Sequence, residues 1–108
     1  MDGFTLIADP TRRRILDALR VEPHDVNALI ALLGVSQSLV SKHLRVLREA
    51  GAVTADTDGR RRVYRLAVDP LPDVLGWVTP YHRKWSDSFD RLAKALDRRD
   101  DRFRPDTT

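Results

Sequence analysis

Residues 36–66 read SQSLVSKHLRVLREAGAVTADTDGRRRVYRL, and this stretch decides the fold. At about 100° per residue, Val40, Leu44 and Leu47 fall on one face of a helix that covers its first half. The opposite face is polar and carries Ser38, Lys42, Arg45 and Glu49. We therefore expect one face of this helix to pack on a core and the other to contact a partner.

The second half of the stretch predicts a β-hairpin. The turn signal Asp-Gly at 58–59 separates a strand that begins at Ala52 from a returning strand over 61–66. Because side chains alternate along a strand, Tyr64 and Leu66 are expected to face inward. Arginine at three successive positions makes this hairpin basic.

Two further helices are predicted before this stretch. Asp9 and Pro10 provide the cap and the first position of one helix. Asp25 caps the next helix, Gly34 ends it, and Ser36 caps the helix of residues 36–51. Two helices joined by a short turn with glycine form a helix-turn-helix, and the basic hairpin extends it to a winged helix.

The arginines of the first of these helices have expected partners nearby. Arg12 lies on the apolar side, where we expect its stem to pack and its head to pair with an acid. Arg13 can pair with Asp17 one turn later. Before this helix, Phe4, Ile7 and Ala8 predict a short helical turn that packs on an apolar surface, for which a second subunit is the candidate.

The C-terminal third of the chain predicts a helix that needs a partner. Its repeat alternates intervals of four and three and is apolar except at His82: Leu71, Leu75, Val78, His82, Trp85, Phe89, Leu92 and Leu96. Pro80 lacks an N–H and Thr79 precedes it, so we expect a kink or a break in which Thr79 caps a new helix. Residues 98–108 lack periodicity and are expected to fray.

These elements predict a mainly α fold with a β-hairpin wing, that is, a winged helix-turn-helix DNA-binding domain with a C-terminal dimerisation helix. We expect a single domain over residues 1–97, with the tail at 98–108 outside it. Its expected parts are a helix-turn-helix at about 25–50, a wing at about 52–66, and dimerisation helices at about 4–8 and 71–97.

Positive charge is concentrated where the fold would contact a partner. The chain has 19 Lys and Arg against 16 Asp and Glu, a net charge of +3. Residues 36–66 hold seven basic against three acidic residues (+4), residues 1–35 four against five (−1), and residues 67–108 eight against eight (0). A basic surface kept for solubility would not be concentrated in this way, so we interpret it as a footprint for phosphate.

Composition excludes several classes of protein. A chain of 108 residues buries only about 60–68% of its unfolded surface, so dimerisation would add useful burial. The absence of Cys excludes disulfides, thiolate metal sites and iron–sulfur clusters. The sequence has no apolar run of about 18 residues and no signal pattern in MDGFTLIADP, so we expect a soluble, cytoplasmic protein without a membrane partner.

With these motifs placed, the chain resembles the ArsR family of bacterial winged-helix repressors over nearly its whole length. The matching stretches are ADPTRRRIL at 8–16, LLGVSQSLVSKHLRVLREAGAV at 32–53 and DGRRRVYRL at 58–66. The last helix, with Trp77, Tyr81 and Trp85, resembles the branch that lacks metal. The resemblance implies a homodimer that pairs through its first and last helices, binds an inverted-repeat operator and usually represses its own operon.

The three histidines do not match the metal-sensing branches. Those branches carry cysteines by the recognition helix, or Asp and His on the last helix with a second His downstream. This sequence has no Cys, and His24, His43 and His82 lack His or Cys neighbours at ligand spacing, so a zinc site is disfavoured and no cofactor is expected. A packed, hydrogen-bonded His43 is favoured over a base reader, and a neutral buried His82 over a pH-sensitive interface.

The expected DNA contacts lie on the helix of residues 36–51 and on the wing. The helix would place side chains and free N–H groups against phosphates and base edges in the major groove, and the wing arginines would reach phosphates or the adjoining minor groove. The expected contact residues are Ser36, Gln37, Ser38, Ser41, Lys42, Arg45, Arg60, Arg61 and Arg62. The alternative for the three wing arginines is charge that protects an edge strand from aggregation.

The expected dimer interface consists of apolar residues from the first and last helices: Phe4, Ile7, Leu75, Val78, Trp85, Phe89 and Leu92. A rival interpretation is a winged-helix protein-interaction module that has no specific operator and uses this surface. An enzyme is disfavoured because the sequence shows no nucleophile–base pair, carboxylate dyad or Gly-rich phosphate loop. A small-molecule effector is an open expectation, as is a pH response or no effector at all.

Overall fold

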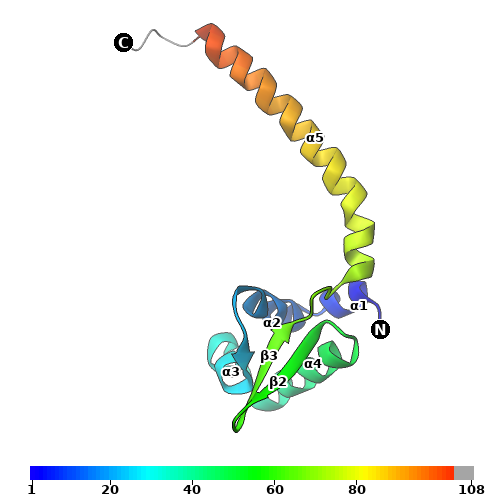
Figure 1. The fold of residues 1–108 in the computed structure, drawn as a ribbon, viewed down its shortest axis with the longest axis vertical. Coiled ribbons are helices and arrows are strands. Elements are labelled where there is room, and N and C mark those ends of the chain that lie inside the picture. Colours follow the sequence, from blue (N-terminus) through cyan, green and yellow to red (C-terminus); the bar gives the residue numbers. More distant parts are fainter. Residues whose placement is uncertain (104–108) are drawn as a thin grey trace. The chain divides into compact units, whose positions relative to one another are not determined.

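The structure is a computed structural model that describes the backbone of residues 1–103 and the side chains of residues 1–98. Its elements follow the predicted order, with one short strand added (Figure 1). They are α1 (Gly3–Ala8), α2 (Pro10–Val21), β1 (His24–Asp25), α3 (Val26–Leu33), α4 (Gln37–Glu49), β2 (Val53–Asp58), β3 (Arg61–Leu66) and α5 (Pro72–Phe103). The fold is mainly α with a β-hairpin wing, as predicted.

The predicted helix caps are confirmed. The Asp25 carboxylate accepts a 2.8 Å hydrogen bond from the Ala28 N–H at the start of α3. Gly34 ends α3 with a φ of 69°, a left-handed conformation that glycine adopts without steric cost. Ser36 then caps α4 by accepting from the Leu39 N–H at 3.2 Å. The two caps and the glycine turn therefore fix α3 and α4 as a helix-turn-helix.

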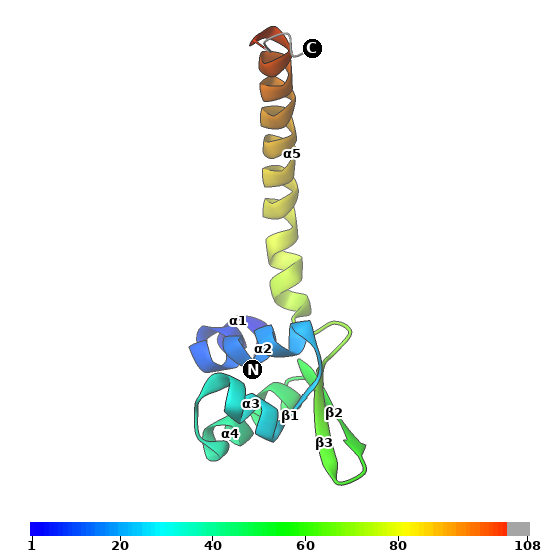
Figure 2. The ribbon, with the colours of Figure 1, turned by 90° about the vertical axis from the view of Figure 1, so that its left-hand side faces the viewer.

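The sheet is antiparallel with strand order β1-β3-β2. Asp58 pairs with Arg61, so the hairpin tip is Gly59-Arg60, one residue later than the turn signal suggested. The hairpin extends beyond α3 and α4 (Figure 2). β1 was not predicted, because two residues are too few to show a strand pattern.

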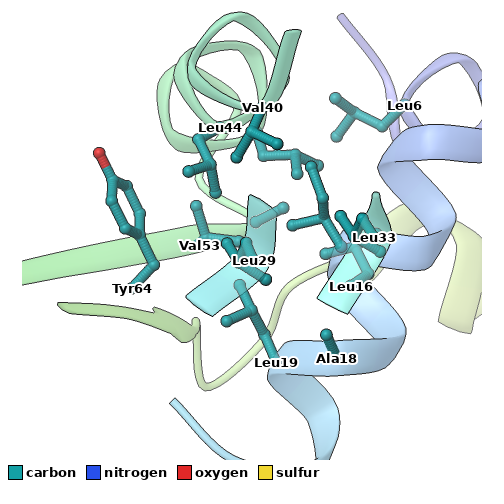
Figure 3. Packing of buried hydrophobic residues seen from close by; sticks show 13 residues of the cluster. Leu6, Leu16, Ala18, Leu19, Leu29, Leu33, Val40, Leu44, Val53 and Tyr64 are labelled. Carbon is teal, nitrogen blue, oxygen red and sulfur yellow. The ribbon is translucent and has the colours of Figure 1, made fainter. Parts of the chain in front are cut away.

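The core of the first compact unit, residues 1–74, collects apolar side chains from α1 to β3 (Figure 3). Val40, Leu44 and Leu47 of α4 are at most 1% exposed, which confirms the predicted packing face of that helix. Tyr64 is 8% exposed and closes the cluster beside Leu44, as expected for an inward-facing position. Leu6, which the sequence analysis did not single out, anchors α1 at 2% exposed.

Arg12, Arg13 and Arg14 cap helix ends, which corrects the acid pairing predicted for Arg12 and Arg13. Arg12 donates to the carbonyl oxygens of Leu6, at 2.7 Å, and Thr5, at 3.0 Å. Arg13 was expected to pair with Asp17, but it donates instead to the Ile7 carbonyl at 2.7 Å. Arg14 donates to the carbonyl of Leu33, the last residue of α3, at 3.0 Å. The terminal carbonyls of a helix lack intrahelical donors and carry partial negative charge, so they compete well with a carboxylate.

α5 continues through Pro80, so the break at Thr79, which was predicted as the alternative to a kink, is wrong. The Thr79 hydroxyl donates to the carbonyl of Leu75 at 2.6 Å and follows the helix instead of starting a new one. The helix also continues to Phe103, past the predicted start of the frayed tail at residue 98. The rest of that tail, residues 104–108, lies outside the described residues. No helix among the described residues is long and apolar enough to cross a membrane.

Candidate nucleic-acid interface

The exposed face of α4 presents the predicted contact residues together. Its buried side holds the helix on the core, which leaves Ser36, Gln37, Ser38, Ser41, Lys42 and Arg45 exposed. We call these six residues the α4 face. The hydroxyl oxygens of Ser36 and Ser38 lie 3.3 Å apart at its N-terminal end. The face therefore offers hydroxyl, amide and cationic groups, which are the side chains that pair with phosphates and with base edges.

Arg45 is the one residue of the α4 face with an ion pair in the described structure. Its Nε lies 3.3 Å from Oε1 of Glu49 one turn later. Both side chains are open to solvent, at 80% and 69% exposed, so the pair is weak and can exchange partners. Arg45 therefore remains available to a base or a phosphate.

The wing arginines are all exposed but have different surroundings. Arg61 donates from Nε to Oδ2 of Asp25 at 2.9 Å, so it joins the wing to the start of α3. Arg62 lies over the Tyr64 ring, with its guanidinium carbon 5.6 Å from the ring centroid. Arg60 lies at the hairpin tip. In the wing, Arg61 is thus fixed by Asp25, whereas Arg60 and Arg62 can extend toward a partner.

The edge-strand alternative now applies to only part of the wing. β3 is the central strand of the sheet, which is not an edge. β1 reaches only Val63 and Tyr64, so the segment of β3 that carries Arg61 and Arg62 has a single partner strand, β2. Edge protection therefore remains an alternative for these two residues alone.

Asp25 links the helix-turn-helix to the wing electrostatically. The Ala28 N–H and the Arg61 guanidinium both donate to it, and in that order they lower the pKa of its carboxyl group below the ordinary value of 3.8. The sequence analysis identified Asp25 as a cap but gave no sign of the bond to Arg61. These residues lie 36 positions apart, so only the fold brings them together.

His43 is packed, as predicted, but it is not hydrogen-bonded. Its side chain belongs to the buried face of α4 and is 5% exposed as a residue. Its Nε2 lies 3.8 Å from Oδ1 of Asp9, beyond hydrogen-bond distance, and its Nδ1 has no hydrogen-bond partner in the described structure. His43 therefore does not reach the α4 face. No three His, Cys, Asp or Glu side chains among the described residues are grouped closely enough to hold a metal ion.

A groove between α4 and β3 contains residues that sequence reasoning missed. Its volume is about 640 Å³ and it is lined by Ser41, Arg45, Arg48, Glu49, Arg62 and Tyr64. We call it the arginine groove. Arg48 and Tyr64 were not predicted as contact residues. The spacing of Arg48, seven residues after Ser41 and three after Arg45, is the signal that could have placed it on this side of the helix.

The predicted interface residues of α1 and α5 differ in exposure. Those of α5 are open to solvent in the single chain, from 38% at Val78 to 64% at Trp85. On α1, Phe4 is 43% exposed, whereas Ile7 is half-buried against the core. His82 is exposed, so the burial expected for it is absent from the single chain.

Comparison with known proteins gives a consistent set of relatives. A family model described as "Bacterial regulatory protein, arsR family" matches residues 9–55. The HTH-type transcriptional regulator Rv2034 of Mycobacterium tuberculosis is 37% identical over 88% of this chain and 86% of its own length. The chain spans about half the length of other curated mycobacterial relatives that it matches.

Two solved structures share the fold. A crystal structure described as a "possible transcriptional regulator for arsenical resistance" has a TM-score of 0.63 and 39% identity, over 88% of this chain and 96% of that one. The solution structure of a homodimeric winged helix-turn-helix DNA-binding domain from Mycobacterium bovis has a TM-score of 0.60 and 25% identity, over 78% of each chain.

Proposed function

The chain belongs to the ArsR family of bacterial regulatory proteins, and on that premise we propose that it is a homodimeric repressor that binds an inverted-repeat DNA operator. It would act as a binding protein, like its relatives, which are transcriptional regulators and not enzymes. Its site of action would be the cytoplasm, where bacterial DNA lies.

The observation that carries this proposal is the pairing of the α4 face with a basic wing. The α4 face has a width and polarity that suit the major groove, which admits an α-helix. The wing places Arg60 and Arg62 beside it, exposed and without an acidic partner in the described structure. DNA offers both base edges and a continuous row of phosphates, and this surface has groups for each.

The apolar residues of α1 and α5 support dimerisation. On α5, rings stack along the helix, with the Trp85 and Phe89 centroids 5.6 Å apart. Exposed apolar surface of this extent is unusual for a monomer. A second copy of the same chain would cover it symmetrically. The similar winged helix-turn-helix domain from Mycobacterium bovis is described as homodimeric.

We place the chain in the branch of the family that lacks metal-binding cysteines and propose that its DNA binding is independent of metal. The chemical support is the donor set, since the sequence has no Cys and its three histidines are widely spaced. The single domain over residues 1–97 is part of the same proposal.

The base-reading role is tested by substituting the α4 face. Gln37→Ala and Arg45→Ala should each change preference at particular base pairs, at a cost of about 1–3 kcal/mol for the preferred base. Binding should be measured against DNA duplexes selected from a random pool by the wild-type protein. Arg20→Ala, an exposed arginine of α2, is the matched control and should leave preference unchanged. Equal weakening on all sequences would contradict base reading by Gln37 and Arg45.

The wing is tested by the salt dependence of binding. Each phosphate neutralised contributes about 0.9 to the slope of log K against log salt, so Arg61→Gln with Arg62→Gln in both subunits should flatten it by up to about 3.6. Because Arg61 also bonds to Asp25, circular dichroism must first show that the variant is folded. An unchanged slope in a folded variant would assign these arginines to edge protection.

The rival function is a protein-interaction module that uses the exposed residues of α5. A protein with that function should bind random DNA without a preferred sequence, and this binding should be lost at moderate salt. Selection of a defined sequence from the pool would exclude it.

A further inference from the structure

The arginine groove carries charge that the proposed base-reading residues do not explain. Three arginines line it against one glutamate, so it has a net positive charge. It adjoins the α4 face, because Ser41 and Arg45 belong to both. A concave basic surface beside the α4 face suits an anion whose binding fixes the position of the protein on its partner.

The three arginine side chains of the groove differ in the contacts that they already make within the chain. Arg45 is paired with Glu49, and Arg62 lies over the ring of Tyr64. The side chain of Arg48 is exposed and has neither a hydrogen bond nor an ion pair within the described residues. The hydroxyl of Tyr64 points away from the core (Figure 3). Arg48 and Arg62 are therefore the cations free to bind an anion, on opposite walls formed by α4 and β3.

The geometry of DNA indicates which anion would lie there. In a duplex, one sugar–phosphate strand separates the major groove from the minor groove beside it. A helix in the major groove and a wing on the adjoining minor groove must straddle that strand. The space between α4 and β3 is then occupied by backbone, and guanidinium groups pair with phosphate through two parallel N–H donors.

We propose that the arginine groove is a binding site for a backbone phosphodiester of DNA, with Arg48 and Arg62 as its ligands. Glu49, on the same wall, places a like charge near the phosphate and weakens binding. The site fixes the register of α4 on the duplex without reading sequence. This inference rests on the proposed function, because it requires that DNA lies on the α4 face.

The first test compares Arg48→Gln with Arg20→Gln, which removes the same charge from α2, away from the groove. Both variants, and the full-length wild type, are titrated onto a selected duplex and a scrambled duplex over a series of salt concentrations. Arg48→Gln should lower the salt slope by about 0.9 per bound subunit and weaken both duplexes equally, whereas Arg20→Gln should change neither. Arg62→Gln should behave like Arg48→Gln.

Glu49→Gln should change DNA affinity in the direction opposite to Arg48→Gln. In an Arg45→Ala background, where Glu49 has no ion pair to release, removal of its negative charge should strengthen binding to both duplexes and leave their ratio unchanged. This variant cannot act by unfolding the protein, because a misfolded protein would not bind more tightly. Weaker binding by Glu49→Gln would contradict the proposed arrangement.

The second test identifies the phosphate. Duplexes in which single phosphates are replaced by neutral methylphosphonates are titrated with wild type and Arg48→Gln. At one position per half-site, neutralisation should weaken the wild type but add little further loss in Arg48→Gln. Additive losses at every position would show that Arg48 contacts no phosphate.

The outcomes separate this inference from the proposed function. If the wild type prefers its selected duplex but Arg48→Gln and Arg62→Gln keep the full salt slope, the groove assignment is wrong and the proposed function stands. If the wild type shows no sequence preference, the proposed function fails. Displacement of DNA by inorganic phosphate at constant ionic strength, abolished by Arg48→Gln, would assign the groove to a free anion and overturn the backbone assignment.

Discussion

At the scale of single residues, charged side chains in this chain hold helix ends as well as supplying the proposed contacts to DNA. Arg12, Arg13 and Arg14 donate to carbonyl oxygens of α1 and α3. Sequence alone predicted the caps that lie within three residues of their partners, such as Asp25 and Ser36. It could not predict the bonds from Arg14 to Leu33 or from Arg61 to Asp25, because their partners are set by helix packing and by the register of the sheet.

Asp25 makes the structure sensitive to acid, which gives a prediction at this scale. Its folded pKa is lowered, first by the Ala28 N–H and then by Arg61, so its stabilising contribution is present above the ordinary value of 3.8. That contribution is lost as the pH falls toward and below the folded pKa. Asp25→Asn keeps an efficient cap but no charge, so its unfolding temperature should fall less steeply between pH 6 and about 3 than that of the wild type.

Thermal unfolding followed by circular dichroism over this pH range checks the acid prediction. Asp17→Asn is the control, because Asp17 is an exposed aspartate that caps no helix in the described structure. The same acid dependence in wild type and Asp25→Asn would show that the ionised form of Asp25 does not stabilise the fold.

At the scale of elements, hydrophobic periodicity predicted helices and strands better than it predicted their ends. The spacing of Val40, Leu44 and Leu47 placed α4 correctly, because burial on one face of a helix leaves a clear pattern. The break that was one of the two alternatives at Pro80 does not occur, because a single lost backbone hydrogen bond does not end a long helix whose other residues favour it. β1 depends on pairing with β3, so its two residues carry no local signal.

The packing of α3 gives a second prediction at the element scale. Leu29 is 0% exposed and Leu32, three residues later on the same helix, is 58% exposed. Leu29→Ala should lower the free energy of unfolding by about 2–5 kcal/mol because it leaves a cavity in the core. Leu32→Ala should change it by no more than about 0.5 kcal/mol. Urea unfolding of both variants measures the difference, and equal losses would contradict the observed packing of α3.

At the scale of the whole molecule, one chain leaves its apolar residues on α5 uncovered, and the proposed second copy would cover them. The sequence predicted this need for a partner from the repeat through Leu75, Val78 and Trp85. The arrangement of the two copies could not be predicted, because it depends on contacts between surfaces and not on local pattern. The arginine groove could not be predicted for a similar reason, because α4 and β3 meet only in the folded chain.

Dimerisation is checked by substituting the apolar residues of α5. Phe89 is 55% exposed and would be buried twice in a two-fold interface, once in each subunit. Because burial of one such side chain contributes about 1.5–3 kcal/mol and two are lost, Phe89→Ser should raise the dimer dissociation constant by at least about a hundredfold. Arg83→Ser, on the opposite side of α5, is the control. Sedimentation at micromolar concentration should show wild-type dimers, and wild-type monomers alone would argue against the proposed interface.

Selection from random duplexes by the wild-type chain shows whether two copies of the α4 face act together on two-fold symmetric DNA. We expect an enriched inverted repeat whose half-sites are centred about 10 base pairs, or a multiple of that distance, apart. Enrichment of a single asymmetric site, or of no sequence at all, would contradict it.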